Sequence, residues 1–162
     1  MLNFKNRRAY RGFTLIELTV TVALVGLLAW ATVPLFEITT TRVKEVELKS
    51  ALRQIRTALD AYKAAADAGA VSKTVTESGY PPSLELLTEG IETTNRLGVR
   101  RVVFIRQIPR DPFFPDQTIS PAKQWLTRSY GGVFEDSRSD DIFDVASRSK
   151  RIALNGTPYR EW

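Results

Sequence analysis

Hydrophobic residues follow two contrasting patterns along the chain, and the first is a continuous apolar run. Residues 18–36 read LTVTVALVGLLAWATVPLF, without a charged side chain. This length and composition predict a helix able to cross a membrane, because a spanning helix needs about 20 apolar residues. Glu17 lies directly before the run. A carboxylate near the start of a membrane helix costs on the order of a few kcal/mol unless it pairs with a positive group. Its presence at position 17 therefore indicates that Glu17 has a functional role.

The second pattern, after Pro34, is charged and amphipathic. Charged residues, among them Glu45, Lys49, Arg53 and Arg56, alternate there with apolar ones. The apolar residues recur at spacings of three and four, which is typical of one face of a helix. This apolar stripe comprises Leu48, Leu52, Ile55, Leu59, Tyr62 and Ala66. We expect Val43, Val46 and Ala58 to widen it and Gly69 to end the helix. The pattern predicts an amphipathic helix over residues 37–69 that packs on the rest of a small domain.

Residues 70–162 predict a small α+β head. A polar loop over residues 70–80 leads to residues 81–87 (PPSLELL), which read as a turn into a short helix with Ser83 as N-cap and Gly90 as stop. Residues 99–108 could form a strand or a short helix, and the prolines of residues 109–112 exclude a regular element. Short strands are expected over residues 125–130 and 142–147 and near Tyr159, separated by glycine turns.

The predicted fold class is therefore α+β, with a long N-terminal helix packed on a small C-terminal antiparallel sheet. The membrane-crossing part would be residues 13–36, followed by the amphipathic part. The head is expected to bury four aromatic residues in its core: Trp125, Phe134, Phe143 and Tyr159.

The net charge is mainly a topology signal. The chain carries a formal charge of +5, but four cations without an acidic counterpart lie in residues 1–12: Lys5, Arg7, Arg8 and Arg11. Without these four, 19 basic residues face 18 acidic ones, a balance of +1. Positive flanks stay on the cytoplasmic side of a membrane span, so the C-terminal part is expected outside the cytoplasm. The near-neutral remainder predicts no nucleic-acid partner.

Cleavage after Gly12 would place an α-amine on Phe13, four residues before Glu17 and about one helical turn away. Residues 12–17 (GFTLIE), between a basic leader and an apolar helix, resemble the class III signal of type IV pilins and type II secretion pseudopilins. The resemblance implies that prepilin peptidase cleaves after Gly12, methylates the amine of Phe13 and removes residues 1–12. It also implies that Glu17 acts in assembly and that Pro34 bends the helix.

Three alternatives at this end of the chain stay open. Pro34 could simply end the membrane span. Residues 29–31 (AWA) fit the small-x-small rule of ordinary signal peptidase, which would release a soluble protein beginning at Thr32. The basic leader and apolar run could also be an ordinary signal anchor in which Glu17 has no role.

The head has further resemblances. Residues 80–87 (YPPSLELL) and 108–113 (IPRDPF) are similar to segments of major pseudopilins of type II secretion, which also generally lack cysteine, as this chain does. Such pseudopilins hold calcium in an acidic loop near their last strands. The corresponding acids here are Asp136, Asp140 and Asp141, but Arg138 interrupts them, and a solvated acidic loop is the competing interpretation.

Enzymatic chemistry finds no support. The chain has no cysteine or histidine, so the commonest metal ligands and general base are missing. Two S-x-x-K matches, at Ser120 and Ser147, lack their companion motifs, and no Walker or dinucleotide-binding pattern occurs. A set of arginines is expected to form a solvated face or a subunit contact rather than an anion site: Arg96, Arg100, Arg101, Arg106 and Arg110.

The sequence thus predicts a non-enzymatic subunit of a type II secretion pseudopilus, without a cofactor. It would be a single-pass inner-membrane protein with a cytoplasmic N-terminus and a periplasmic head. The expected partners are further copies of itself, prepilin peptidase, the inner-membrane assembly platform and minor pseudopilins. The alternatives are an adhesion or DNA-uptake pilin and the secreted protein cleaved after Ala31.

Overall fold

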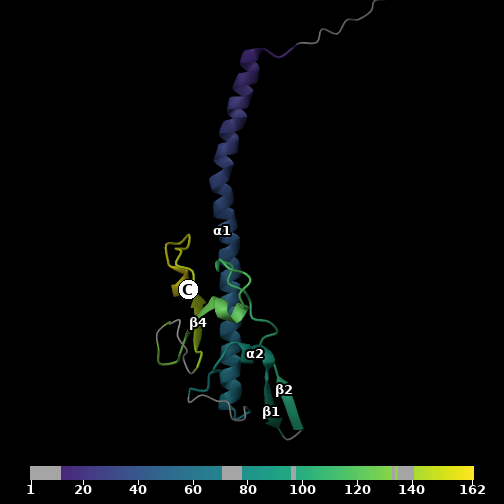
Figure 1. The fold of residues 1–162 in the computed structure, drawn as a ribbon, viewed down its shortest axis with the longest axis vertical. Coiled ribbons are helices and arrows are strands. Elements are labelled where there is room, and N and C mark those ends of the chain that lie inside the picture. Colours follow the sequence, from purple (N-terminus) through teal and green to yellow (C-terminus); the bar gives the residue numbers. More distant parts are fainter. Residues whose placement is uncertain (1–11, 71–77, 96–97, 133, 135–140) are drawn as a thin grey trace, which may run out of the picture. The chain divides into compact units, whose positions relative to one another are not determined.

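A computed structural model describes residues 12–70, 78–95, 98–132, 134 and 141–162, with only the backbone for residues 34–35, 93–95 and 98–100. The chain divides into two compact units, Met1–Thr40 and Thr41–Trp162, and each is treated separately below. The eight elements of the described residues begin with one long helix, α1 (Leu15–Asp67), which contributes to both units. In Figure 1, the other labelled elements of the second unit gather along the C-terminal part of α1.

Helix α1 has 53 residues and is helical through Pro34. The expected bend at Pro34 therefore involves no break in the helix, and its role stays a prediction. The C-terminal end follows the sequence prediction. Gly69 has a φ of 69°, which favours glycine, and its N–H donates to the Ala66 carbonyl at 2.9 Å.

The apolar stripe of α1 forms the core of the second unit. Its first five residues, Leu48, Leu52, Ile55, Leu59 and Tyr62, are at most 3 % exposed, and Ala66 is half-buried against the same core. Ala58 is also buried, as predicted.

The prediction for Val43 and Val46 is wrong, because they are 63 % and 69 % exposed. At 3.6 residues per turn, Val46 lies about 160° around the helix from Leu48, on the opposite face.

Helix α2 (Glu85–Glu89) is the predicted short helix, but its N-cap is Leu84, not Ser83. Leu84 has helical φ and ψ of −69° and −29° and makes no side-chain capping bond, so the prediction of a serine cap is wrong. Leu84 is instead held by burial, at 2 % exposed. Gly90 ends α2 as predicted, with a φ of 75°, and a Cβ there would lie 2.6 Å from the Val102 carbonyl oxygen.

The strands form two small antiparallel sheets. β1 (Ile91–Asn95) pairs with β2 (Gly98–Val102) in a hairpin, with Ile91 opposite Val102. β3 (Trp125–Arg128) pairs with β4 (Asp144–Ser147), with Trp125 opposite Ser147. Residues 99–108 are thus a strand only in their first part. No regular element occupies residues 103–119, and within this range only the part at residues 109–112 was predicted, from its prolines.

The strand expected near Tyr159 is absent from the described residues. The segment forms instead an isolated bridge between Ile152 and Pro158 and a 3₁₀ helix, η2 (Tyr159–Glu161); a second 3₁₀ helix, η1 (Pro121–Gln124), precedes β3. Pro158 lacks an N–H and cannot continue a strand ladder. The predicted α+β class, a long helix with small antiparallel sheets toward the C-terminus, is confirmed.

Aromatic residues and one ion-pair network complete the second unit. Trp125 and Tyr159 are buried as predicted, whereas Phe143 and Phe134 are only half-buried. The Arg56 Nε donates to Asp144 Oδ1 at 2.7 Å, and Arg128 Nη2 donates to Asp144 Oδ2 at 3.0 Å. Asp144 thereby joins α1 to β3 and β4.

Candidate processing and assembly site

The residues of the predicted processing signal lie at the start of α1 in the first unit. Gly12, Phe13 and Thr14 precede the helix, and Phe13 is 79 % exposed. Glu17 lies in the first turn and is exposed. The structure therefore presents the bond after Gly12 in a non-helical, accessible segment.

Thr14 caps the helix. Its Oγ1 accepts a hydrogen bond from the Glu17 N–H at 3.2 Å, and its carbonyl accepts one from the Leu18 N–H at 3.1 Å. Thr14 is thus the N-cap and Glu17 the third helical residue, the T-x-x-E spacing of a capping box. Sequence reasoning missed this role of Thr14, although the spacing was visible in the sequence.

The position of Glu17 at the start of the helix lowers part of the free-energy cost of placing its carboxylate in a membrane. A carboxylate near a helix N-terminus gains about 0.3–1 kcal/mol from the helix dipole. Translocon measurements set the cost of an acid at the centre of a span at about 2.5–3.5 kcal/mol. The helix start offsets only part of a cost of that order, so a full positive charge is still needed if Glu17 enters a membrane.

Gly12 has no structural reason to be glycine. A Cβ built there meets nothing within 4 Å, and the backbone is not in the left-handed region. The fold of the chain would accept alanine or a larger residue at this position. A requirement for glycine would therefore come from an external agent such as a peptidase that reads the segment.

The apolar side chains of the first unit are exposed on every side of the helix. The large apolar residues with 49 % to 81 % exposure are Leu15, Ile16, Leu18, Val20, Val22, Leu24, Val25, Leu27, Leu28, Trp30, Val33 and Phe36. Among the described residues, α1 is the one helix long and apolar enough to cross a membrane, by length and composition. An unpaired apolar surface of this kind requires lipid or other protein.

The threonines of the apolar run are satisfied within the helix. The hydroxyls of Thr19, Thr21 and Thr32 donate to carbonyls three residues earlier at 2.9, 2.9 and 2.7 Å. Since each hydroxyl hydrogen already has an acceptor, these side chains need no water. The segment is therefore compatible with an environment that offers no hydrogen-bonding solvent.

The structure describes little of the weak calcium candidate. Asp141 is buried at 8 % exposure, whereas Asp136 and Asp140 lie outside the described residues. Within the described ranges, no group of three acidic, cysteine or histidine side chains is placed to hold a metal ion. Calcium binding thus stays an untested prediction.

A buried carboxylate that sequence reasoning did not single out lies in the second unit. Asp111 is fully buried, and its carboxylate accepts hydrogen bonds from Ser147 Oγ at 2.6 Å and from the Phe113 N–H at 2.9 Å. The Gln124 side chain accepts from the Asp111 N–H at 3.1 Å. Burial raises the pKa of Asp111, and the hydrogen bonds from Ser147, Phe113 and Arg148 oppose this rise. This network fastens the loop after β2 to β4.

Comparison with known proteins gave a match for the N-terminal segment of the chain. A family model described as the prokaryotic N-terminal methylation motif matches residues 7–33. The match marks the chain as type IV pilin-like. It covers the basic leader, the Gly12–Phe13 bond, Glu17 and most of the apolar run, and it indicates a substrate of prepilin peptidase. Comparison with curated proteins and with solved structures gave no match.

The pilin-like match and the geometry concern the same residues. The motif lies where the structure has an accessible segment, a capped helix start and an exposed apolar helix. The individual roles of Gly12, Phe13, Glu17 and Pro34 stay predictions, because they depend on the peptidase and on other copies of the chain.

Proposed function

We propose that this chain is a non-enzymatic subunit of a periplasmic pseudopilus of type II protein secretion. The precursor is held in the inner membrane by its apolar run and is cleaved after Gly12. The mature chain then polymerises through its N-terminal helix. The observation that carries this proposal is the methylation motif at the head of a helix whose large apolar side chains are exposed all around.

The exposed apolar surface of the first unit supports polymerisation. Twelve large apolar residues between positions 15 and 36 lack partners in the described part of their own chain. In the precursor, lipid covers them. In a filament, the same helices of neighbouring copies would cover them, and the amine of Phe13 would lie opposite Glu17 of an adjacent copy. That ion pair would set the register between subunits.

The choice of a secretion pseudopilus over a pilus is supported by the head. Tyr80 and Leu84, within YPPSLELL, and Asp111, within IPRDPF, are all buried and belong to the packing of the second unit. The two segments that resemble major pseudopilins are therefore structural parts of this head. The absence of cysteine points the same way, since many pilins close a loop of the head with a disulfide.

Mass spectrometry of the N-terminus of the chain purified from membranes tests the processing step. We expect a mature chain that begins at Phe13 with one added methyl group. A chain that begins at Thr32 would establish the secreted alternative, and one that begins at Met1 would overturn the proposal.

Substitution of Gly12 provides the matched test. Gly12→Val should leave the leader attached and should not change the fold, because a Cβ at this position meets no atom of the described residues within 4 Å. Gly26→Val, at a second glycine with open surroundings, is the control and should be cleaved normally. Equal cleavage of both variants would contradict recognition of Gly12.

A secretion assay separates the pseudopilus from the pilus. Deletion of the gene should stop export of proteins that use the type II pathway, and the full chain should restore it. Loss of adhesion or of DNA uptake with export intact would instead establish the pilin alternative.

A further inference from the structure

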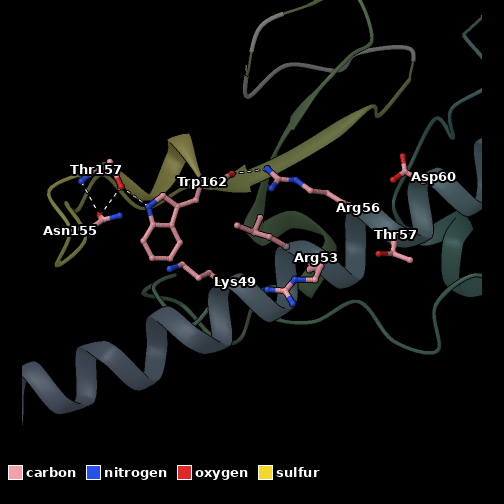
Figure 2. A pocket seen from close by; sticks show the side chains of 9 residues that line it. Lys49, Arg53, Arg56, Thr57, Asp60, Asn155, Thr157 and Trp162 are labelled. Carbon is pink, nitrogen blue, oxygen red and sulfur yellow. Dashed lines mark hydrogen bonds between the residues drawn. The ribbon is translucent and has the colours of Figure 1, made fainter.

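A groove lined by charged side chains runs along α1 in the second unit. One wall is a stripe of α1, and the other is the segment after β4. The groove has a volume of about 560 Å³, within the range of binding pockets. Figure 2 shows the side chains that line it: Lys49, Leu52, Arg53, Arg56, Thr57, Asp60, Asn155, Thr157 and Trp162.

The N-terminal end of the groove is cationic. Lys49 and Arg53 are exposed and one helical turn apart, which places their Cβ atoms about 5–6 Å from each other. Two like charges at this spacing are unfavourable. Lys49 Nζ lies 4.4 Å from the ring centroid of Trp162. Neither cation forms an ion pair with any described residue, so acidic groups bound at this end would relieve the repulsion.

The charged neighbours of these two cations are already used by the fold. Arg56 Nε donates to Asp144 Oδ1 at 2.7 Å. Glu45, one turn before Lys49, accepts a hydrogen bond from the Tyr159 hydroxyl at 3.0 Å. The cation pair on α1 therefore has no carboxylate partner in the described part of its own chain, and carboxylates of another chain can fill that role.

Matching acids lie on α2. Residues 78–95 contain three acids and no base. Two of these acids, Glu85 and Glu89, are the first and last residues of α2, and both are exposed. Neither forms an ion pair with a described residue. Since they are also one helical turn apart, they have the spacing of the cation pair on α1 and the opposite charge.

Both pairs are unique among the helices that the structure describes. Lys49 and Arg53 are the one pair of exposed cations four residues apart, and Glu85 and Glu89 are the one such pair of acids. Asp60, also exposed, lies seven residues beyond Arg53, about 10 Å along the helix. A nucleic acid or another long polyanion would reach Asp60 and be repelled. The acidic pair of α2 is short enough to end before it.

We propose that this groove binds α2 of a second copy of the chain, with Glu85 and Glu89 opposite Lys49 and Arg53. Each copy carries the two halves of the contact on different elements. The groove of one copy therefore engages α2 of the next, whose own groove stays free. Repeated, such a contact builds a ring or an open filament. The inference rests on the proposed function, since it assumes that copies of the chain assemble.

Carbodiimide cross-linking of co-expressed full-length chains in membranes tests the contact, because this reagent joins a lysine amine directly to a carboxylate. One chain carries Glu85→Gln and Glu89→Gln, and the other carries Lys49→Arg. The amine at position 49 and the two α2 carboxylates then belong to different copies, so a link between them reports a contact between copies. We expect mass spectrometry to find Lys49 joined to Glu85 or Glu89.

Lys123 provides the matched control, since its amine is exposed on the same unit and lies outside the groove. It should give little cross-link to α2. No link from Lys49, equal links from Lys49 and Lys123, or a link from Lys49 to a different protein would each overturn the proposal.

Charge reversal measures what the contact contributes to assembly. Lys49→Glu with Arg53→Glu should lower the yield of sheared filaments about tenfold, as expected for the loss of two exposed ion pairs. Glu85→Lys with Glu89→Lys should have the same effect. All four changes in one chain reverse both sides of the contact and should restore the yield. Normal assembly with one side reversed, or no recovery with both reversed, would contradict the proposal.

The cross-link and the filaments are measured separately in the same cells. If filaments form without the link from Lys49, the groove proposal is wrong and the proposed function stands. If the link forms and the natural chain gives no filaments, the contact between copies stands and the proposed function is wrong.

Discussion

Residues 15–40 and 41–67 belong to the same helix, yet their side chains meet opposite surroundings. In the first part, Leu24 and Leu28 are 56 % and 68 % exposed, whereas in the second part Leu48 and Leu59 are fully buried. Both parts are rich in apolar residues with helical preference. The difference is that residues 78–162 supply a covering surface for the second part, whereas no described residue covers the first.

This contrast shows where each unit obtains its stabilisation. Full burial of a leucine contributes about 1.5–3 kcal/mol. The second unit gains this from its own chain, so its stability belongs to the folded monomer. No described residue supplies it to the first unit, which would gain it from lipid or from other chains. A substitution should therefore affect folding in one unit and assembly or insertion in the other.

The largest expected effect is on assembly. Glu17→Ala would leave the amine of a neighbouring Phe13 without a counter-charge, and loss of one partner of a desolvated ion pair costs about 3 kcal/mol or more. We expect the assembled fraction to fall about 100-fold while cleavage continues. Sheared filaments and the precursor-to-mature ratio are the measurements. Glu37→Ala, an acid at the other end of the apolar run, is the control and should assemble normally; efficient assembly of Glu17→Ala would contradict the register model.

The next effect is on the core. Leu52→Ala should lower the free energy of unfolding of the second unit by about 2–5 kcal/mol, because it leaves a cavity beneath α1. Leu24→Ala makes the same chemical change in the first unit and should not alter that unfolding transition. Denaturant unfolding of the full chain in detergent, followed by tryptophan fluorescence, measures both. A similar loss of unfolding free energy for the two variants would show that the two units are not stabilised independently.

A smaller, pH-dependent effect is expected at Asp111. Asp111→Ala should destabilise the second unit by about 1–3 kcal/mol, because the Ser147 hydroxyl and the Phe113 N–H lose their acceptor. The raised pKa of Asp111 means that its contribution to stability is full below its ordinary pKa of 3.8 and is lost as the pH rises through the folded value.

The pH dependence is tested with the near-isosteric Asp111→Asn. Between pH 7 and pH 4.5, the stability of the natural chain relative to this variant should increase as the pH falls. Urea unfolding at several pH values measures the difference. A difference that does not change with pH would show that the carboxylate does not titrate across this range.

The smallest effect concerns the contact between α1 and the segment after β4. Glu45 Oε1 accepts hydrogen bonds from the Tyr159 hydroxyl at 3.0 Å and from the Leu154 N–H at 2.8 Å. Burial, with the bond to Glu45, raises the pKa of Tyr159 to about 12. Tyr159→Phe should cost about 1 kcal/mol in thermal unfolding. Tyr130→Phe, at a mostly exposed ring, is the control. An equal loss of thermal stability in this variant would show that the hydrogen bond to Glu45 is not the cause.

The sequence predicted those features that depend on local chemistry. The apolar run, the stripe from Leu48 to Tyr62 and the glycine stops at Gly69 and Gly90 follow from helical periodicity and backbone freedom, and all are found. The signal around Gly12 was recognised because it combines a residue pattern with a charge pattern. The T-x-x-E spacing of Thr14 and Glu17 is likewise a local pattern that the sequence alone contains.

The features that the sequence did not predict depend on contacts between distant residues. Glu45 and Arg56 lie off the apolar stripe, yet they bond to Tyr159 and Asp144, which lie about a hundred positions away in the sequence. Strand β1 was not predicted, because its residues, IETTN, have no apolar alternation. The C-terminal segment was expected to be a strand, and Pro158 prevents it.

The threonines of the apolar run have a further consequence. Thr19, Thr21 and Thr32 carry their own acceptors with them, so the segment presents an equally inert exterior to hydrocarbon and to protein. Extraction from the bilayer would require no exchange of hydroxyl partners along the way. The hydroxyl groups of such a subunit would therefore add little to the free-energy barrier for moving the helix from lipid into a filament. Glu17, in the first turn of the helix, is the group whose surroundings would change most in that transfer.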